Sequence, residues 1–360
     1  MRFTIEGLGT ALPPRRVSQE EATAHALARC VDGERDERRL AALYRRSGVA
    51  SRHSVLEDGA EERLFPLGPH GGEQSARTSE RMRLYAAKAL PLAAEAARKA
   101  LREADADPAT ITHLVTVSCT GFAAPGLDVG LIHELGLPPA VTRTQVGFMG
   151  CHGLLNGLAV ADAFARSAAG SRVLLSSTEL CTLHFRNGSG ADRVVANALF
   201  ADGAGALVGS ALAGATPGWS LIGSGSVVLP QTEEQMGWRI GDHGFEMELS
   251  AQVPETIERA LASWISSWLD RFGIGIDDVK TWAIHPGGPR VLDACESSLG
   301  LSSGACRVSR EVLRECGNMS SATVLFILER LFRDGAPPPC VLLAFGPGLV
   351  VEAALLGAQR

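Results

Sequence analysis

The chain has 360 residues, of which 46% are hydrophobic and 21% are charged, and its formal net charge is −6. A chain of this length can bury a large core, while the acidic balance and the lack of a basic run argue against nucleic acid or an anionic membrane surface as a partner. The first ten residues lack the apolar core of a signal peptide, and no apolar run approaches the roughly 18 residues that cross a bilayer, so we expect a cytoplasmic protein.

The N-terminal part of the chain is predicted to contain one short strand and two long helices. The strand covers residues 3–8, and a turn with two prolines separates it from a charged helix over about residues 18–46. A loop rich in Gly, Pro and acidic residues at 57–77 leads to an alanine-rich helix at 82–102, which Thr78 can cap.

The middle and the last third of the chain repeat one order of elements. Each copy has an apolar strand, a turn rich in Gly and Pro, and a helix that ends in Leu-Gly-Leu; the strands lie at residues 113–118 and 281–284. After each copy a glycine precedes a polar residue that opens an apolar helix, Gly150-Cys151 in the first and Gly317-Asn318 in the second. The repeat indicates two related βαβ-type units.

A pseudo-two-fold axis between these units would divide the chain into an N-terminal half, 1–215, and a C-terminal half, 216–360. Strand ends and helix starts from both halves would then meet at the centre, where Cys151, His285 and Asn318 could converge. His285 follows a buried strand and is either a catalytic or a structural histidine. Asn318 is either a hydrogen-bond donor to substrate or a helix cap.

Cys151 is the candidate nucleophile. The eight cysteines include no C-x-x-C pair, and no histidine cluster has metal-ligand spacing, so we predict reduced thiols and no metal site. Cys151 precedes an apolar helix predicted over residues 154–169. A thiol in the first turn of a helix faces the positive end of the macrodipole, which stabilises its thiolate. A core cysteine is the alternative, because free cysteine is among the most buried residue types.

Three strings of the sequence resemble the type III polyketide synthases, the chalcone-synthase-like branch of the thiolase-fold condensing enzymes. They are WAIHPGGP at 282–289, GNMSSATVLFIL at 317–328 and FGPG at 345–348, in the order and spacing of that family. The resemblance implies an α/β thiolase fold, five-layered αβαβα with two pseudo-two-fold-related halves, and a homodimer. It also implies a Cys151-His285-Asn318 active site that uses malonyl-CoA and an acyl-CoA starter, with no metal and no other cofactor.

The resemblance also implies the residues that contact substrate. Phe200 corresponds to the gatekeeper between the CoA tunnel and the cavity, although the glycine that usually follows it is Ala201 here. Arg46 and Arg52 lie where the family binds CoA phosphates, and an ordinary solvated face is the alternative for this basic cluster. The expected substrate-binding residues are Phe200, Cys119, Cys181, His184, Trp238, Met247, Ser320, Gly346 and Pro347.

Departures from the plant enzymes bear on the size of the starter. Cys119 and Cys181 stand where plant members usually carry threonine, as in bacterial tetrahydroxynaphthalene synthases. Trp238 stands near a position that is glycine in chalcone synthases, and Met247 replaces a second gatekeeping phenylalanine. If Trp238 lines the cavity rather than the core or the dimer interface, a small starter such as malonyl-CoA is favoured. His184 either lines the cavity or packs elsewhere.

Other functions remain possible at this point. A long-chain alkylpyrone or alkylresorcinol synthase would use the same active-site residues, as would a ketosynthase that joins two preformed acyl chains. A Cys-His-Asn hydrolase would leave the CoA-facing arginines and Phe200 without a purpose. A non-enzymatic CoA-binding partner would not need the three active-site residues.

Overall fold

A nine-stranded sheet runs through the part of the chain that the structure, a computed structural model, describes: residues 2–31, 33–67, 74–211 and 219–358. The strand order is β11-β12-β13-β8-β1-β7-β6-β4-β5. The strands of the first half are β1 (Thr4–Ala11), β4 (His113–Ser118), β5 (Thr142–Gly147), β6 (Arg172–Leu180) and β7 (Asp202–Ser210). Those of the second half are β8 (Trp219–Val228), β11 (Thr281–Ile284), β12 (Cys340–Gly346) and β13 (Val350–Ala358).

The two halves of the sheet have the same topology. In the first, β4 is parallel to β6, while β6, β7 and β1 are successively antiparallel. In the second, β11 is parallel to β12, while β12, β13 and β8 are successively antiparallel. The first half adds the edge strand β5, and β1 meets β8 where Thr4 pairs with Ser220. The repeat inferred from the sequence is therefore confirmed, although the predicted boundary at residue 215 lies outside the described residues.

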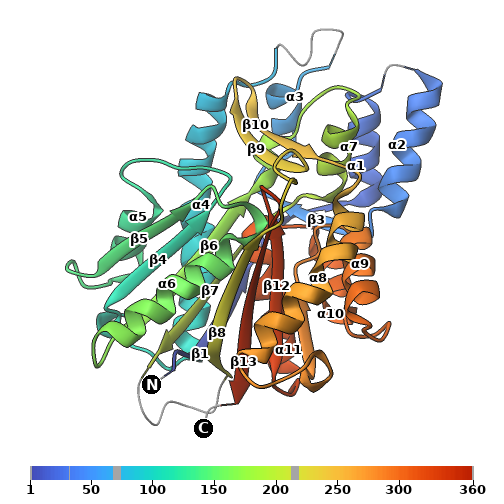
Figure 1. Ribbon diagram of the computed structural model, residues 1–360. Helices are drawn as coiled ribbons and strands as arrows, with labels where there is room; N and C mark the ends of the chain where they lie inside the picture. The colour runs from blue at the N-terminus through green and yellow to red at the C-terminus, as the bar shows by residue number, and fades with distance from the viewer. Residues whose placement is uncertain (1, 32, 68–73, 212–218, 359–360) are drawn as a thin grey trace.

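Helices on both faces of the sheet complete five layers (Figure 1). α4 (Thr78–Glu103) and α5 (Leu127–Leu135) cover the outer face of the first half, and α8 (Val253–Asp270) and α9 (Pro289–Leu299) cover that of the second. α6 (Gly153–Ser167) and α11 (Thr323–Arg333) lie between the halves, since each contacts strands of both. The order αβαβα matches the predicted thiolase fold.

A helical cap and two small two-stranded sheets close one end of the sheet. The cap consists of α1 (Gln19–Leu27), α2 (Glu34–Arg46), α3 (Ala60–Leu64), α7 (Ala191–Leu199) and α10 (Arg307–Cys316). The small sheets pair β2 (Arg15–Ser18) with β3 (Ser51–Ser54) and β9 (Met236–Gly241) with β10 (Gly244–Leu249). The single charged helix predicted over 18–46 is wrong, because the chain turns after Ala28 to bury Cys30 against α7.

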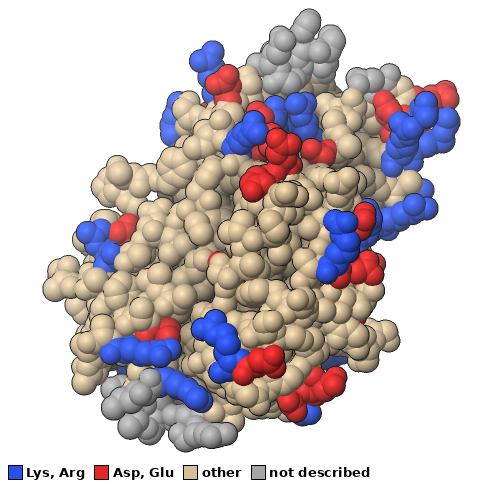
Figure 2. All heavy atoms as spheres, viewed as in Figure 1, with Lys and Arg blue, Asp and Glu red and all other residues tan. Residues whose placement is uncertain are grey.

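The charged side chains are spread in small mixed groups. On the face in Figure 2, Lys and Arg lie beside Asp and Glu around the rim, with broad uncharged areas between them. This face therefore carries no basic stripe of the kind that binds nucleic acid. Among the described helices, none is both long enough and apolar enough to cross a membrane.

Candidate active site

Cys151 lies in a 3-10 turn, η2 (Gly150–His152), that leads into α6. Gly150 has a φ of 74°, and a Cβ there would lie 2.4 Å from Cδ of Pro347. Glycine is therefore required both by the backbone conformation and by the close approach of the turn that follows β12. The two halves of the sheet are brought together at this contact.

Ser320 stands between two thiols at the centre of the molecule. Its hydroxyl lies 3.6 Å from Sγ of Cys151 and 3.1 Å from Sγ of Cys119. The Cys119 thiol donates in turn to Oε1 of Glu179 at 3.2 Å. Ser320 has a φ of 47°, which non-glycine residues rarely adopt and which often marks functional sites.

Asn318 enters this centre from the second half of the chain. Its backbone is held beside Leu199 and Ala201 by two hydrogen bonds of 2.9 Å. Its side-chain oxygen accepts the N–H of Ser320 at 2.8 Å. The amide nitrogen is then left to donate to the Cys151 thiol, and this hydrogen bond lowers the pKa of Cys151. Asn318 does not occupy the N-cap position of η5 (Ser320–Ala322) or of α11, which are Met319 and Ala322, so the helix-cap alternative is wrong.

His285 follows β11 and is buried without a side-chain partner. Its backbone N–H donates to the carbonyl of Leu343 at 2.8 Å, which continues the pairing of β11 with β12. The side chain is 1% exposed, and neither ring nitrogen has a hydrogen-bond partner among the described residues. Buried polar groups are nearly always paired, so two free nitrogens indicate a group kept for substrate.

The protonation of this pair differs from the expected thiolate. Burial, reinforced by the charge of Glu179, raises the pKa of Cys151 to about 12 against the opposing hydrogen bonds of Ser320 and Asn318. Burial lowers the pKa of His285 to about 3. Both groups are therefore neutral in the resting protein. The macrodipole of α6 does not lower the pKa of Cys151 below that of a free thiol, because Cys151 precedes the helix and lies near a buried carboxylate.

A cavity of about 320 Å³ extends from Cys151 to the helical cap. Its walls include eight of the nine expected substrate-binding residues: Phe200, Cys119, Cys181, His184, Trp238, Met247, Ser320 and Pro347. Gly346 is not on the wall, because it lies directly beneath the ring of His152, where a Cβ would be 2.2 Å from a ring carbon. His285 and Asn318 are also absent from the lining, so they lie behind the cavity surface.

Three aromatic side chains, His184, Trp238 and Phe245, form one wall of the cavity. Nδ1 of His184 accepts the backbone N–H of Phe245 at 2.9 Å, so Nε2 carries the proton that is donated to the carbonyl of Thr120 at 2.7 Å. The ring stacks on Phe245 with centroids 4.2 Å apart, and Trp238 packs edge-on against it at 5.6 Å. The Trp238 indole N–H donates to the carbonyl of Cys119 at 2.7 Å.

This wall settles the orientation of Trp238 and His184, both of which line the cavity. Burial lowers the pKa of His184 to about 3, so its ring is neutral and its tautomer is set by its two backbone partners. The sequence did not predict that Phe245 lines the cavity. The Gly-Phe pair that begins β10 gave no signal, since an isolated phenylalanine in a strand is ordinarily a core residue.

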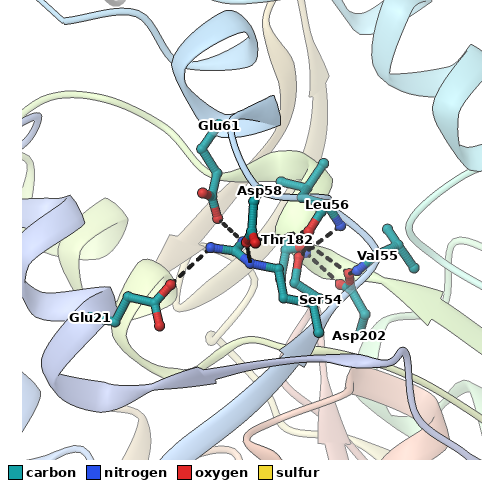
Figure 3. A network of polar contacts seen from close by, with 9 residues as sticks. Glu21, Ser54, Val55, Leu56, Asp58, Glu61, Thr182 and Asp202 are labelled. Atoms are coloured by element: carbon teal, nitrogen blue, oxygen red, sulfur yellow. Dashed lines mark hydrogen bonds and ion pairs between the residues drawn. The ribbon is translucent and has the colours of Figure 1, made fainter.

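The mouth of the cavity is acidic on one side. Arg15 forms ion pairs with Glu21 and Asp58 at 2.9 and 2.8 Å and also pairs with Glu61; Figure 3 shows these three carboxylates turned toward one another. One cation faces three carboxylates there. Behind it, Asp202 accepts hydrogen bonds from Thr182, and burial raises the pKa of Asp202 to about 6 (Figure 3).

Two further arginines of the cavity lining differ in their ion pairing. Arg186 pairs with Glu246 at 2.9 Å, while the exposed Arg193 has no ion pair among the described residues. Both line the cavity. Arg46 is exposed in the last turn of α2, outside the lining.

Arg52 does not occupy the position expected of a CoA-phosphate ligand. It is 5% exposed, and its guanidinium donates to the carbonyls of Asn197, Ala198 and Phe200 at 2.6 to 2.9 Å and to the side chain of Gln19. These bonds hold the turn that carries Phe200. The assignment from the sequence is corrected accordingly: a guanidinium engaged with buried carbonyls is not free to bind phosphate.

No group of three or more His, Cys, Asp or Glu side chains among the described residues could hold a metal ion. All eight cysteines are free thiols.

Comparison with known proteins covers almost the whole chain. The family model described as "Chalcone and stilbene synthases, N-terminal domain" matches residues 2–217, and the corresponding C-terminal model matches residues 221–359. The chain is 33% identical to "Alpha-pyrone synthesis polyketide synthase-like Pks18" of Mycobacterium tuberculosis, covering 99% of this chain and 91% of the relative.

Two further similarities are of the same extent. The chain is 35% identical to "1,3,6,8-tetrahydroxynaphthalene synthase" of Streptomyces peucetius subsp. caesius, covering 98% of this chain and 92% of the relative. The crystal structure of PKS-I from the brown alga Ectocarpus siliculosus superposes with a TM-score of 0.92 at 31% identity, covering 99% of this chain and 98% of that chain.

Proposed function

Because the chain belongs to the chalcone and stilbene synthase family and is a type III polyketide synthase, we propose that it loads a small acyl-CoA starter on Cys151 and extends it with malonyl-CoA. The product is a small aromatic or pyrone compound. The observation that carries this proposal is a cavity of about 320 Å³ whose lining contains both Cys151 and the aromatic wall of Trp238, His184 and Phe245.

Loading begins with a proton transfer. Since Cys151 and His285 are both neutral at rest, the thiol attacks the thioester carbonyl while its proton moves to an unpartnered nitrogen of His285. The bond between Sγ and the acyl carbon forms, the bond to the CoA sulfur breaks, and the CoA thiolate takes the proton from His285. His285 returns to the neutral state.

Chain extension needs donors for an enolate oxygen. Loss of carbon dioxide from malonyl-CoA leaves a carbanion whose charge resides largely on the thioester oxygen. The amide nitrogen of Asn318 and the single N–H of neutral His285 supply two donors, which preorganised sites use to stabilise such charge. The carbanion then attacks the acyl group on Cys151, and the released Cys151 thiolate is ready to accept the lengthened chain.

The CoA phosphates are assigned to two exposed arginines. The side around Arg15 carries an excess of carboxylates and would repel phosphate. Arg193 and Arg46 are exposed and have no ion pair among the described residues. We propose these two as the phosphate contacts, in place of the pair that included Arg52.

The edge strand β5 supports a homodimer. β5 ends the sheet, and Phe122 and Met149 beside it are 47% and 39% exposed. An unpaired edge with exposed apolar neighbours favours a second chain as its cover. We propose that two copies associate through this edge, without a metal or other cofactor, and that the enzyme works in the cytoplasm, where CoA thioesters are available and thiols stay reduced.

Starter identity is the test of the proposal. Purified protein is incubated with labelled malonyl-CoA, alone and with acetyl-, hexanoyl-, lauroyl- and coumaroyl-CoA, and products are identified by mass. The small cavity predicts conversion of malonyl-CoA alone to an aromatic or pyrone product. A preference for lauroyl-CoA would overturn the small-starter reading and favour a long-chain alkylpyrone synthase, the second candidate, which is supported by the similarity to the alpha-pyrone synthase.

A further inference from the structure

A chain of buried polar groups lies behind the catalytic pair and has no part in the mechanism above. His152, the residue after the nucleophile, is 2% exposed, and its Nδ1 lies 2.7 Å from the side-chain oxygen of Asn156. The side-chain nitrogen of Asn156 donates to Oε1 of Glu352 at 3.1 Å. The exposed Ser226 donates to the same oxygen at 2.6 Å. An imidazole is thus linked through one amide to a carboxylate at the edge of the core.

This chain determines the tautomer of His152. An ionised carboxylate only accepts hydrogen bonds, so the end of Asn156 that faces Glu352 must be its NH₂ group. The oxygen of Asn156 then faces His152 and must accept, so the proton of a neutral His152 resides on Nδ1. Its Nε2 is left unprotonated, beside the backbone of Gly346.

Glu352 lies in the strand row of His285, and His152 covers Gly346, two residues further along β12 and on the same face of the sheet. The strand pairing aligns Ile284 with Leu343 and, one residue further, Ala344 with Glu352 and Glu352 with Ser226. His285 follows Ile284 directly, so it stands at the level of this row. His152 is near enough that a positive charge on it lowers the pKa of His285.

We propose that His152, oriented by Glu352 through Asn156, is a positioning residue for His285 that keeps it able to take the Cys151 proton only while His152 itself is neutral. The inference rests on the proposed function, in which His285 receives that proton. It assigns a role to three side chains that the condensation chemistry does not use.

The charged and titratable groups near His152, His285 and Cys151 determine which of the three responds to a proton on His152. Among the described residues, Glu352 on β13 raises the pKa of His152 while burial lowers it more. His285 on β11 responds to burial and to His152. Cys151 responds to Glu179 on β6 and to the hydrogen bonds of Ser320 and Asn318. A proton on His152 therefore affects mainly the pKa of His285, the residue that accepts the Cys151 proton.

The test is the pH profile of Cys151 alkylation by iodoacetamide from pH 4 to 8, followed by peptide mass mapping, with no CoA substrate present. In the wild type the rate should fall at the acid end as His152 gains a proton. In His152→Phe the fall should move to lower pH by about one unit, the size of shift that a nearby charge produces. Glu352→Gln should move it in the same direction by less, because removal of the carboxylate keeps His152 neutral to lower pH.

His113→Phe is the matched control. Burial also lowers the pKa of His113, but this residue begins β4, at the end of the strand opposite Cys119, so its removal should leave the acid limb in place. An unchanged limb in Glu352→Gln and in folded His152→Phe would overturn the inference. So would a loss in His152→Phe that is equal at every pH, since that is a purely structural effect. Alkylation needs no polyketide chemistry, so a protein that makes no polyketide yet shows the shifted limb refutes the proposed function alone.

Discussion

Two buried histidines lie at the candidate site, His285 behind the cavity surface and His184 in its aromatic wall, and the two rings differ in their partners. His285 has no hydrogen bond on either nitrogen among the described residues, whereas His184 has one on each. Burial lowers the pKa of both to about 3. The lowered pKa is therefore the same for the proposed catalytic histidine and for the histidine of the wall, and does not distinguish them. Unused hydrogen-bonding capacity does.

Substitution of the two histidines should separate chemistry from shape most strongly. His285→Ala should slow acyl loading of Cys151 by about 10²- to 10⁴-fold, the usual contribution of a general base. His184→Phe keeps an aromatic ring in the wall and should leave loading of a small starter within about tenfold of the wild type. Single-turnover loading with labelled acyl-CoA measures both. Equal losses in the two variants would contradict the distinction.

The Asn318→Ala variant should sharpen the description of the site around Cys151. Its amide serves the enolate oxygen, so decarboxylation of malonyl-CoA should fall by an amount equivalent to about 2.7–4 kcal/mol, as for other single oxyanion donors. Loading of Cys151 should fall much less. Carbon dioxide release and covalent loading are measured on the same preparation. A loading defect as large as that of His285→Ala would refute the division of labour.

Trp238→Gly tests the aromatic wall of the cavity. Removing the indole opens space next to His184 and Phe245, so the variant should shift toward hexanoyl- or coumaroyl-CoA starters or longer products by about 10- to 200-fold in relative efficiency. Loading of acetyl-CoA should survive. An unchanged product profile in a folded variant would show that the indole does not limit the cavity.

Stability should respond to the two histidines in the opposite order. His184→Ala leaves the carbonyl of Thr120 and the N–H of Phe245 unpaired in the core, which should cost about 1–3 kcal/mol for each group that water cannot reach. His285→Ala orphans no partner and should cost less. Urea unfolding, followed by circular dichroism, compares them. A larger loss for His285→Ala would break the comparison.

Acid is the one condition in which the two histidines should act alike. Each is neutral in the fold down to about pH 3 and binds a proton near pH 6.5 when unfolded, so the unfolded state holds more protons in this window. The contribution of each neutral histidine to the free energy of unfolding is then fully present above about pH 6.5. It falls by up to about 1.4 kcal/mol per pH unit for each histidine as the pH decreases toward 3. Replacing either histidine by Phe should reduce this slope, as measured by urea midpoints from pH 4 to 7.

Most of the fold could be predicted from local patterns in the sequence. The repeat of strand, Gly/Pro turn and helix predicted two related halves, because each unit follows from residues within about 40 positions of one another. The strings around His285 and Asn318 indicated the family for the same reason. The helix break after Ala28 escaped prediction, since it depends on burial of Cys30 against residues far along the chain.

The candidate site divides in the same way. The sequence by itself determined the candidate residues for the chemistry: a cysteine, a histidine and an asparagine at equivalent ends of the two repeated units. Only the tertiary structure decided that Arg52 is engaged by carbonyls 145 to 148 residues away and that the indole of Trp238 is anchored to the carbonyl of Cys119. It also decided that the catalytic pair rests neutral. Burial, side-chain direction and protonation are properties of contacts between distant segments, and no pattern of neighbouring residues specifies those contacts.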